Sequence, residues 1–359
     1  MAKKLKVGII GCGGIAANKH LPAIAGIKEA EVTAFCDTIP EKAESMCKLH
    51  GAEGAKTYSD YKELLKDGSI DVVHVLTPNR SHSPITVEAL EAGKHVMCEK
   101  PMATSYAEAK KMADAAKKTG KLLTIGYQMR CMPAALYLKK VCERGDLGEI
   151  YFAKAHAIRR RAVPTWGVFL NEKEQGGGCL IDIGTHALDV TLWMMDNYKP
   201  KSVMGSVYKK LGNKPDSGNM WGPWDPKEFT VEDSAFGFIT MENGATVSLE
   251  VSWALNTLQI GEGICTLCGT KAGADMWDGL RINSDDLGKC TMTKPDLDVG
   301  AVQYYSGAAM EPKDIECRTW YDAILNGTEL RVKPEQAIVV TQILEAIYES
   351  ARSGKQVNF

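Results

Sequence analysis

Short apolar runs alternate with amphipathic stretches over the first third of the chain. Such runs, closed by glycine or by a polar residue, are typical of buried parallel strands. We expect strands at Leu5–Ile10, Val32–Cys36, Val72–Leu76, His95–Cys98 and Leu122–Ile125. Helices are expected at 40–49, 83–92 and 105–119, with Gly51, Gly93 and Gly120 as their stop signals. Strands alternating with helices predict an α/β domain with a doubly wound parallel sheet of the Rossmann type.

The pattern changes after residue 128, where strands begin to follow one another without helices between them. The expected strands are 150–158, 202–207, 234–240, 245–253 and 263–268. Helices are expected at 133–142, 179–195 and 336–351, and long loops at 212–226 and 282–295. This order predicts an α+β domain with a large, mostly antiparallel open sheet. The expected domains are therefore residues 1–128 and residues 129–359.

Composition narrows the class of protein. The chain has 359 residues, a net charge of −2 and 25% charged residues, so it gives no electrostatic reason to expect nucleic acid or a membrane surface as a partner. No apolar run approaches the ~20 residues of a membrane helix, and the N-terminus does not resemble a signal peptide, so we expect a cytoplasmic protein. Eleven cysteines indicate reduced thiols. Cys265 and Cys268 would point to opposite faces of a strand, and we expect no metal site.

A glycine-rich turn follows the first expected strand. Residues 11–16 read GCGGIA, which fits the G-x-G-x-x-G/A dinucleotide pattern in its required place between a strand and a helix. Gly11 permits a tight turn, and Gly13 lets the backbone approach a pyrophosphate. Ala16 allows close packing of helix on strand, and the helix N-terminus offers N–H groups to the anion, so Gly14 and Ile15 are also expected beside the cofactor.

Asp37 follows the second expected strand, where its carboxylate can accept hydrogen bonds from the ribose hydroxyls of NAD. The same charge would repel the 2′-phosphate of NADP, and Thr38 and Ile39 bring no arginine to reverse that preference. The residues therefore predict NAD as the cofactor.

Three further motifs, in order along the chain, resemble the Gfo/Idh/MocA family of oxidoreductases. Residues 75–82 read VLTPNRSH, residues 92–101 read AGKHVMCEKP and residues 176–189 read GGGCLIDIGTHALD. The resemblance covers nearly the whole chain. It implies a sugar or polyol dehydrogenase, with Thr77, Asn79, His82, Glu99, Lys100 and Gln128 near the cofactor.

The same resemblance implies that Lys100, Asp182 and His186 are catalytic and also contact the substrate. The bond before Pro101 is expected to be cis, as is frequent in the family. Asp182 and His186 are four residues apart and share a helix face. An imidazole beside a carboxylate suits removal of the alcohol proton while hydride leaves for nicotinamide. Lys100 can stabilise the alkoxide or take the proton, and the residues leave open whether it or His186 is the acceptor.

The second domain offers candidate substrate contacts. The resemblance implies that His156 and Arg159, on its first strand, face the sugar. Residues 159–167 (RRRAVPTWG) resemble bacterial members that oxidise glycosides, often at C3, and Trp166, Trp221 or Trp224 can stack on a sugar ring. Where many relatives have Trp-Arg, this chain has Trp166 followed by Gly167, which puts the contact of that arginine in doubt.

The expected reaction is hydride transfer between NAD and a sugar or glycoside secondary alcohol, with C3 of a pyranoside preferred. Oxidation of inositol or a free hexose is the close alternative. Two other classes remain: a glycoside hydrolase that oxidises C3 transiently with retained NAD, and a non-catalytic NAD-binding regulator. The open sheet predicts a homo-oligomer in which a neighbouring subunit covers its free face.

Overall fold

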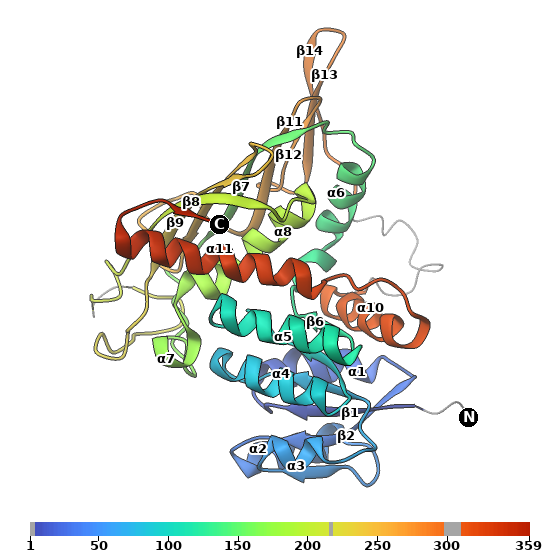
Figure 1. Cartoon of the computed structure of the whole chain (residues 1–359). Helices are drawn as coiled ribbons and strands as arrows, with labels where there is room; N and C mark the ends of the chain where they lie inside the picture. Colours follow the sequence, from blue (N-terminus) through green and yellow to red (C-terminus); the bar gives the residue numbers. More distant parts are fainter. Residues whose placement is uncertain (1–3, 215–217, 298–309) are drawn as a thin grey trace. The chain divides into compact units, whose positions relative to one another are not determined.

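The computed structural model describes residues 4–214, 218–297 and 310–359, which form two compact units (Figure 1). The first unit comprises residues 1–131 and 310–338, and the second comprises 132–309 and 339–359. The chain thus returns to the first unit after leaving it. The expected boundary at residue 128 lies close to residue 131, where the first segment of this unit ends. The expected division does not assign residues 310–338 to the first unit.

The first unit contains a six-stranded parallel sheet in the order β3-β2-β1-β4-β5-β6. Its strands are β1 (Leu5–Ile10), β2 (Ala30–Cys36), β3 (Lys56–Tyr58), β4 (Val72–Val75), β5 (His95–Cys98) and β6 (Leu123–Ile125). Its longer helices are α1 (Leu21–Ala25), α2 (Pro40–His50), α3 (Tyr61–Leu65), α4 (His82–Glu91), α5 (Tyr106–Thr119) and α10 (Pro312–Asn326). Short turns of other helices are η1 (Ala16–His20), η2 (Asn79–Ser81) and η3 (Gln128–Cys131). The expected Rossmann-type sheet is confirmed.

The core of this unit explains where the returning segment packs. Val7, Ile9 and Phe35 are fully buried in one cluster with α1, and the same cluster contains Trp320 and Tyr321 of α10. Burial of such side chains contributes about 1.5–3 kcal/mol each. The α10 helix is therefore part of the first hydrophobic core.

The second unit contains a nine-stranded sheet in the order β14-β13-β12-β11-β7-β10-β9-β8-β15, antiparallel except between β7 and β10. Its strands are β7 (Ile150–Ile158), β8 (Pro200–Tyr208), β9 (Ser234–Met241), β10 (Thr246–Ser252), β11 (Gly261–Gly269), β12 (Gly273–Asp275), β13 (Arg281–Asp286), β14 (Lys289–Thr293) and β15 (Val357–Asn358). Its helices are α6 (Pro133–Glu143), α7 (Glu172–Gln175), η4 (Leu180–Gly184), α8 (Thr185–Met195) and the larger part of α11 (Pro334–Ser353). The expected α+β domain with a large, mostly antiparallel sheet is also confirmed.

Helices cover one face of the nine-stranded sheet. The α8 helix packs on β7 and β11. Ile347 of α11 lies against Gly205 and Gly237, which are paired across β8 and β9. Alternation along the strands places Met204, Tyr208 and Phe238 on the opposite face, where all three are exposed.

The prediction of a loop at 282–295 is wrong, because these residues form the β13–β14 hairpin that projects from the end of the sheet (Figure 1). Leu287 and Gly288 connect the strands, both with positive φ, as in the tight turns that suit hairpins. The strands are largely polar and exposed, so they lack the apolar alternation by which strands are recognised. The loop at 212–226 is confirmed for the residues that the structure describes there.

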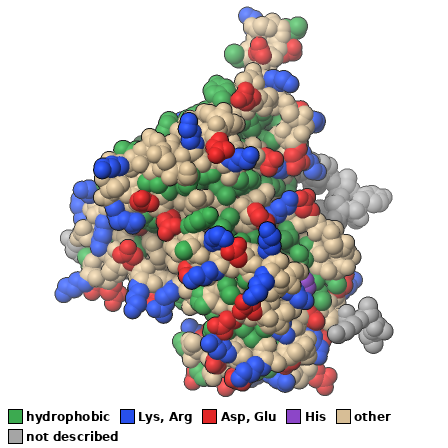
Figure 2. Space-filling view, viewed as in Figure 1, with side chains coloured by type: hydrophobic (Ala, Val, Ile, Leu, Met, Phe, Trp, Pro, Cys, Tyr) green, Lys and Arg blue, Asp and Glu red, His purple; other side chains and the backbone are tan. Residues whose placement is uncertain are grey.

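Charged side chains of both signs are interspersed over the face drawn in Figure 2. No helix in the described part of the chain is long and apolar enough to cross a membrane.

Candidate active site

The predicted cofactor residues of the first unit lie at one edge of its sheet. The glycine turn follows β1, Asp37 follows β2, Thr77 follows β4 and Glu99 follows β5. These four strands are parallel neighbours, so their carboxyl ends meet at the same edge. Ligands of open α/β sheets bind at this edge.

Gly11 and Gly13 have the two different environments that the dinucleotide motif requires. Gly11 has a φ of +96°, and a Cβ there would lie 2.6 Å from the carbonyl oxygen of Leu76. A side chain at Gly13 would meet nothing within 4 Å. Gly11 is thus required by the protein itself, whereas the space over Gly13 is free for a ligand. Ala16 is fully buried, as its packing role predicts.

Asp37 also holds the glycine turn in place. Its Oδ2 accepts a hydrogen bond from the N–H of Cys12 at 2.8 Å, and its Oδ1 accepts one from the N–H of Ile39 at 2.9 Å. Each carboxylate oxygen has a second lone pair, so these bonds leave acceptor capacity for ribose hydroxyls.

His82 joins two loops of this edge. Its Nδ1 lies 2.8 Å from the carbonyl oxygen of Pro101, and its Nε2 lies 2.9 Å from that of Thr77. Burial lowers the pKa of His82, although both carbonyls favour the protonated ring. A neutral imidazole donates to only one of them. The ring is 1% exposed, so we infer that it serves the cofactor by positioning Thr77 and the loop of Lys100.

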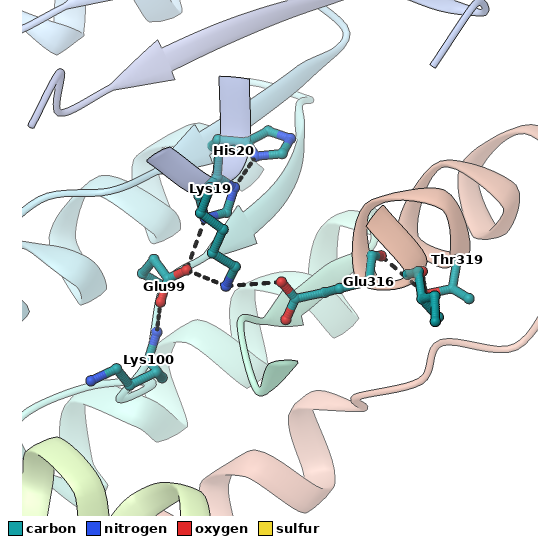
Figure 3. A network of polar contacts seen from close by, with 8 residues as sticks. Lys19, His20, Glu99, Lys100, Glu316 and Thr319 are labelled. Atoms are coloured by element: carbon teal, nitrogen blue, oxygen red, sulfur yellow. Dashed lines mark hydrogen bonds and ion pairs between the residues drawn. The ribbon is translucent and has the colours of Figure 1, made fainter. Parts of the chain in front are cut away.

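Glu99 and Lys100 follow β5, and the bond between Lys100 and Pro101 is cis, as expected. The Glu99 side chain is buried, and its Oε2 accepts a hydrogen bond from the backbone N–H of Lys100 at 3.1 Å. Its Oε1 lies 2.6 Å from Nζ of Lys19 and 2.8 Å from Nε2 of His20 (Figure 3). Neither Lys19 nor His20 belongs to a motif that would predict its place beside Glu99.

The residues of this edge fit NAD. The open space over Gly13 suits the pyrophosphate, and the hydroxyl of Thr77 is buried without a hydrogen-bond partner among the described residues. Asp37 would hold the adenosine ribose. Ile15 is exposed at the start of η1, and Asn79 and Gln128 begin the short helices after β4 and β6. When bound, NAD supplies the acceptor for hydride.

In the second unit, Asp182 and His186 lie on continuous helical backbone. Asp182 is in η4, and His186 is in the first turn of α8. Gly184, between them, lies against β10, where a Cβ would be 2.9 Å from Cγ2 of Val251. This glycine therefore lets the helix carrying both residues approach the sheet closely.

A buried carboxylate anchors the start of this helix. Glu232 accepts hydrogen bonds from the N–H groups of Gly178 at 2.8 Å and Leu180 at 2.9 Å, and from the hydroxyl of Tyr348 at 2.9 Å. Burial raises the pKa of Glu232, and the two backbone donors oppose that effect. The carboxylate thus satisfies N–H groups that the first turn of a helix leaves open.

The triple glycine at 176–178 has a steric cause. A Cβ on Gly177 would lie 2.1 Å from the hydroxyl of Tyr348, and one on Gly178 would lie 2.1 Å from the carbonyl oxygen of Glu232. Both distances are far below any real contact. The glycines are needed because Glu232 and Tyr348 pack directly on the backbone.

Trp253 orients Asp182. Its indole Nε1–H donates a hydrogen bond to Oδ2 of Asp182 at 3.0 Å, and the Trp253 side chain is fully buried. Trp253 and Val251 are two residues apart along β10 and the segment that follows it, so their side chains point to the same face. Val251 contacts Gly184, so this is the face that η4 covers. Sequence reasoning did not identify Trp253 or Glu232, since neither belongs to a recognised motif.

His156 lies on the other face of that sheet. It is paired with Glu250 across β7 and β10, and its Nδ1 is 3.3 Å from Oε2 of Glu250. Ala155 and Ala157, its neighbours in β7, are fully buried, and alternation places His156 opposite to them. Its ring packs edge-on against Trp277, with centroids 4.3 Å apart. This placement argues against His156 as a partner of Asp182 and His186.

Arg159 and two tryptophans form an aromatic group in the loops of the second unit. The guanidinium of Arg159 lies 5.3 Å from the ring of Trp221 and pairs with Glu262 through two nitrogens, at 2.7 and 2.9 Å. Trp166 packs edge-on against Trp221 and is 51% exposed. Trp224 is buried and donates to the carbonyl of Gly212, so it is a packing residue. Trp166 and Trp221 remain candidates for stacking on a sugar.

A glycine turn and an acidic side chain at the carboxyl edge of a parallel sheet, with a carboxylate and an imidazole on a later helix, are typical of an NAD-binding oxidoreductase. Comparison with known proteins gives the family. Residues 5–127 match the oxidoreductase family with an NAD-binding Rossmann fold, and residues 139–359 match the C-terminal alpha/beta domain of the same family. The chain belongs to the Gfo/Idh/MocA family.

Individual relatives agree with that assignment. The chain is 35% identical to D-glucoside 3-dehydrogenase of Escherichia coli K12 over 98% of this chain and 97% of the relative. It is 32% identical to glucose-6-phosphate 3-dehydrogenase of Bacillus subtilis 168 over 69% and 67%. The solved structure of levoglucosan dehydrogenase in complex with NADH and levoglucosan has the same fold, with a TM-score of 0.83 over 99% of both chains at 23% identity.

Proposed function

We propose that the protein oxidises a secondary hydroxyl of a sugar or glycoside, at C3 of a pyranoside, and transfers the hydride to NAD. The observation that carries the proposal is the half-buried Asp182, which Trp253 orients on the helical segment that also bears His186. The names of the two relatives above, which specify oxidation at position 3, support the choice of carbon.

In this proposal Lys100, Asp182 and His186 act on the reacting alcohol. His186 or Lys100 removes the hydroxyl proton, and Asp182 stabilises the resulting positive charge. The C–H hydride passes to nicotinamide, leaving a ketone at C3. Trp166 and Arg159 are proposed to contact the rest of the sugar. No part of the proposal requires a metal ion.

The test is incubation with NAD and separate sugars: methyl and aryl glucosides, glucose 6-phosphate, free glucose and myo-inositol. We expect NADH absorbance to rise with a glucoside, and NMR to identify a 3-keto product. Turnover of myo-inositol or glucose alone would support the closest alternative. Release of the aglycone without net NADH would instead indicate a glycoside hydrolase that recycles NAD in place.

Two variants test the catalytic assignment. Lys100→Ala and His186→Ala are each expected to lower kcat by about 10²–10⁴-fold, the usual range for general acid–base groups. The proton acceptor must be deprotonated to act, so the residue whose loss also removes the acidic limb of the pH–rate profile is the proton acceptor. A chain that binds NAD but oxidises none of the sugars, with or without these changes, would be a regulator instead.

The assembly and the location of the protein are part of the same proposal. The exposed Met204, Tyr208 and Phe238 lie on one face of the nine-stranded sheet, which a second subunit would cover. Sedimentation equilibrium tests for the homo-oligomer. All eleven cysteines are free, which supports a reducing compartment such as the cytoplasm.

A further inference from the structure

Four charged or titratable side chains meet inside the first unit: Lys19, His20, Glu99 and Glu316, which we call the buried polar cluster. Lys19 and His20 come from η1, Glu99 follows β5, and Glu316 lies on α10. Each is less than one-tenth exposed. Residues about 80 and 300 positions downstream thus contact η1 at one point (Figure 3).

Lys19 connects the two carboxylates of the cluster. Its Nζ lies 2.6 Å from Oε1 of Glu99 and 2.9 Å from Oε2 of Glu316. Burial alone would lower the pKa of Lys19, but the two carboxylates raise it above its ordinary value. The ammonium group is therefore held between Glu99 and Glu316.

Glu99 connects the buried polar cluster to the backbone of Lys100. Its Oε1 accepts from Lys19 and contacts His20, and its Oε2 accepts the backbone N–H of Lys100. Gly126 lies against the carboxylate, since a Cβ there would be 3.0 Å from Oε1. In Figure 3 the Lys100 side chain points away from the cluster while its backbone is held by it. The position of the Lys100 backbone thus depends on Glu99.

Stability does not explain the presence of Glu316. Burying a second carboxylate beside an ion pair costs free energy that the added attraction often fails to recover. Burial raises the pKa of Glu316, and its Oε1 has no hydrogen-bond partner among the described residues. A leucine or methionine would fill the same place without that cost. A polar group kept at such a cost is consistent with a geometric role.

We propose that Glu316 is a positioning residue that acts through Lys19 and Glu99 to fix the backbone of Lys100. The inference rests on the proposed function, in which Lys100 acts on the reacting alcohol. The proposal also assigns a role to residues 310–338, which pack in the first unit. The α10 helix in this segment places Glu316 beside Lys19.

The experiment compares Glu316→Gln and Glu316→Met with two controls in the full chain. Gln keeps the shape but not the charge, and Met removes the contact with Lys19. Glu335→Gln makes the same charge change at an exposed position of the first unit. Cys317→Ala weakens the core contact of α10 and leaves all four side chains of the buried polar cluster unchanged.

The first measurement is hydrogen exchange of the Lys100 backbone N–H, which requires no substrate. We expect it to exchange about fivefold faster in Glu316→Gln and faster still in Glu316→Met. Exchange in Glu335→Gln should match the natural protein. Cys317→Ala should lower the stability of the unit without a selective increase in the exchange rate of the Lys100 N–H. Unchanged exchange at Lys100 in both Glu316 variants would overturn the proposal, whatever the activity.

The second measurement is steady-state kinetics with the best glucoside. We expect kcat to fall about tenfold in Glu316→Gln while KM and the affinity for NAD change less than about twofold. Faster exchange with an unchanged kcat would overturn the positioning role. If the natural protein oxidises none of the sugars, the proposed function fails, and faster exchange would then show an anchor with no part in that reaction.

Discussion

The indole of Trp253 donates a hydrogen bond to Asp182 across 71 positions of sequence, at an N–O distance of 3.0 Å. Trp253 comes directly after β10 and Asp182 belongs to η4, so the contact links the sheet to the helix that bears His186. Because Trp253 is fully buried, its indole cannot turn to another partner without repacking of the core. The rotamer of Asp182 is thereby restricted before any substrate binds.

Replacement of Trp253 by Phe should impair catalysis more than folding. The change keeps most of the apolar volume and removes the one donor, so we expect a loss of about 1–3 kcal/mol in the free energy of unfolding. With Asp182 less well oriented, kcat should fall about tenfold with little change in KM. Urea unfolding and steady-state kinetics provide the two measurements.

Trp224→Phe is the matched control for that change. Trp224 is also buried and also donates its indole N–H, at 2.9 Å to the carbonyl of Gly212, but it has no contact with Asp182. A comparable loss of stability without a loss of kcat is expected. An equal fall of kcat in both variants would mean that Trp253 acts only through general stability.

The triple glycine should tolerate no side chain at Gly178. An alanine there would place its Cβ 2.1 Å from the carbonyl oxygen of Glu232, so the start of η4 would have to move and lose hydrogen bonds to that residue. We expect Gly178→Ala to cost more than about 3 kcal/mol of unfolding free energy, from the clash and the lost buried bonds. Thermal unfolding of Gly178→Ala beside Gly68→Ala checks this, because Gly68 has open space around it. Equal melting temperatures would contradict the steric account.

The sequence was most informative where the chemistry is local. The turn at Gly11–Ala16 and the strand at His95–Cys98 were predicted from a few neighbouring residues, and the structure places both as expected. The β13–β14 hairpin was missed because its strands are exposed on both sides and carry no apolar alternation. The α10 helix was missed as well, and with it the return of the chain to the first unit.

Contacts between distant residues account for what was missed in the candidate site. Nothing near Asp182 in the sequence predicts its contact with Trp253, and nothing near Lys19 predicts its ion pair with Glu316, because folding alone brings each pair together. His156 shows the converse. Its strand was predicted with the observed bounds, but only the pairing and packing of the sheet revealed that it faces away from η4.

The preference for NAD should depend on the charge of Asp37. Asp37→Ser keeps a short oxygen-bearing side chain that can still accept from the N–H of Cys12 or Ile39. It loses the bidentate acceptor for the ribose hydroxyls and the repulsion of a 2′-phosphate. We expect KM for NAD to rise about tenfold and the ratio of kcat/KM for NADP over NAD to rise more than that.

Asp60→Ser controls for the backbone effect of that change. Asp60 likewise accepts from a nearby backbone N–H, that of Lys62, at 2.9 Å, at the start of α3. This variant should leave the ratio of the two cofactors unaltered. If Asp37→Ser also leaves the ratio unaltered, Asp37 supports the turn but does not select the cofactor.

Glu316 should make the protein less stable as the pH rises. Burial raises its pKa above the ordinary value of 4.5, against the opposing effect of Lys19, while Glu99 adds to the increase and His20 opposes it. Between 4.5 and the raised pKa, the folded chain binds more protons at this site than the unfolded chain, so the free energy of unfolding falls as pH increases. Each pH unit by which the pKa is raised corresponds to ~1.4 kcal/mol of the free energy of unfolding.

Glu316→Gln cannot titrate, so its melting temperature relative to the natural protein should increase as the pH rises through this window. Calorimetry from about pH 5 to pH 8 measures that difference. A difference that stays constant or shrinks would mean that Glu316 is ionised throughout.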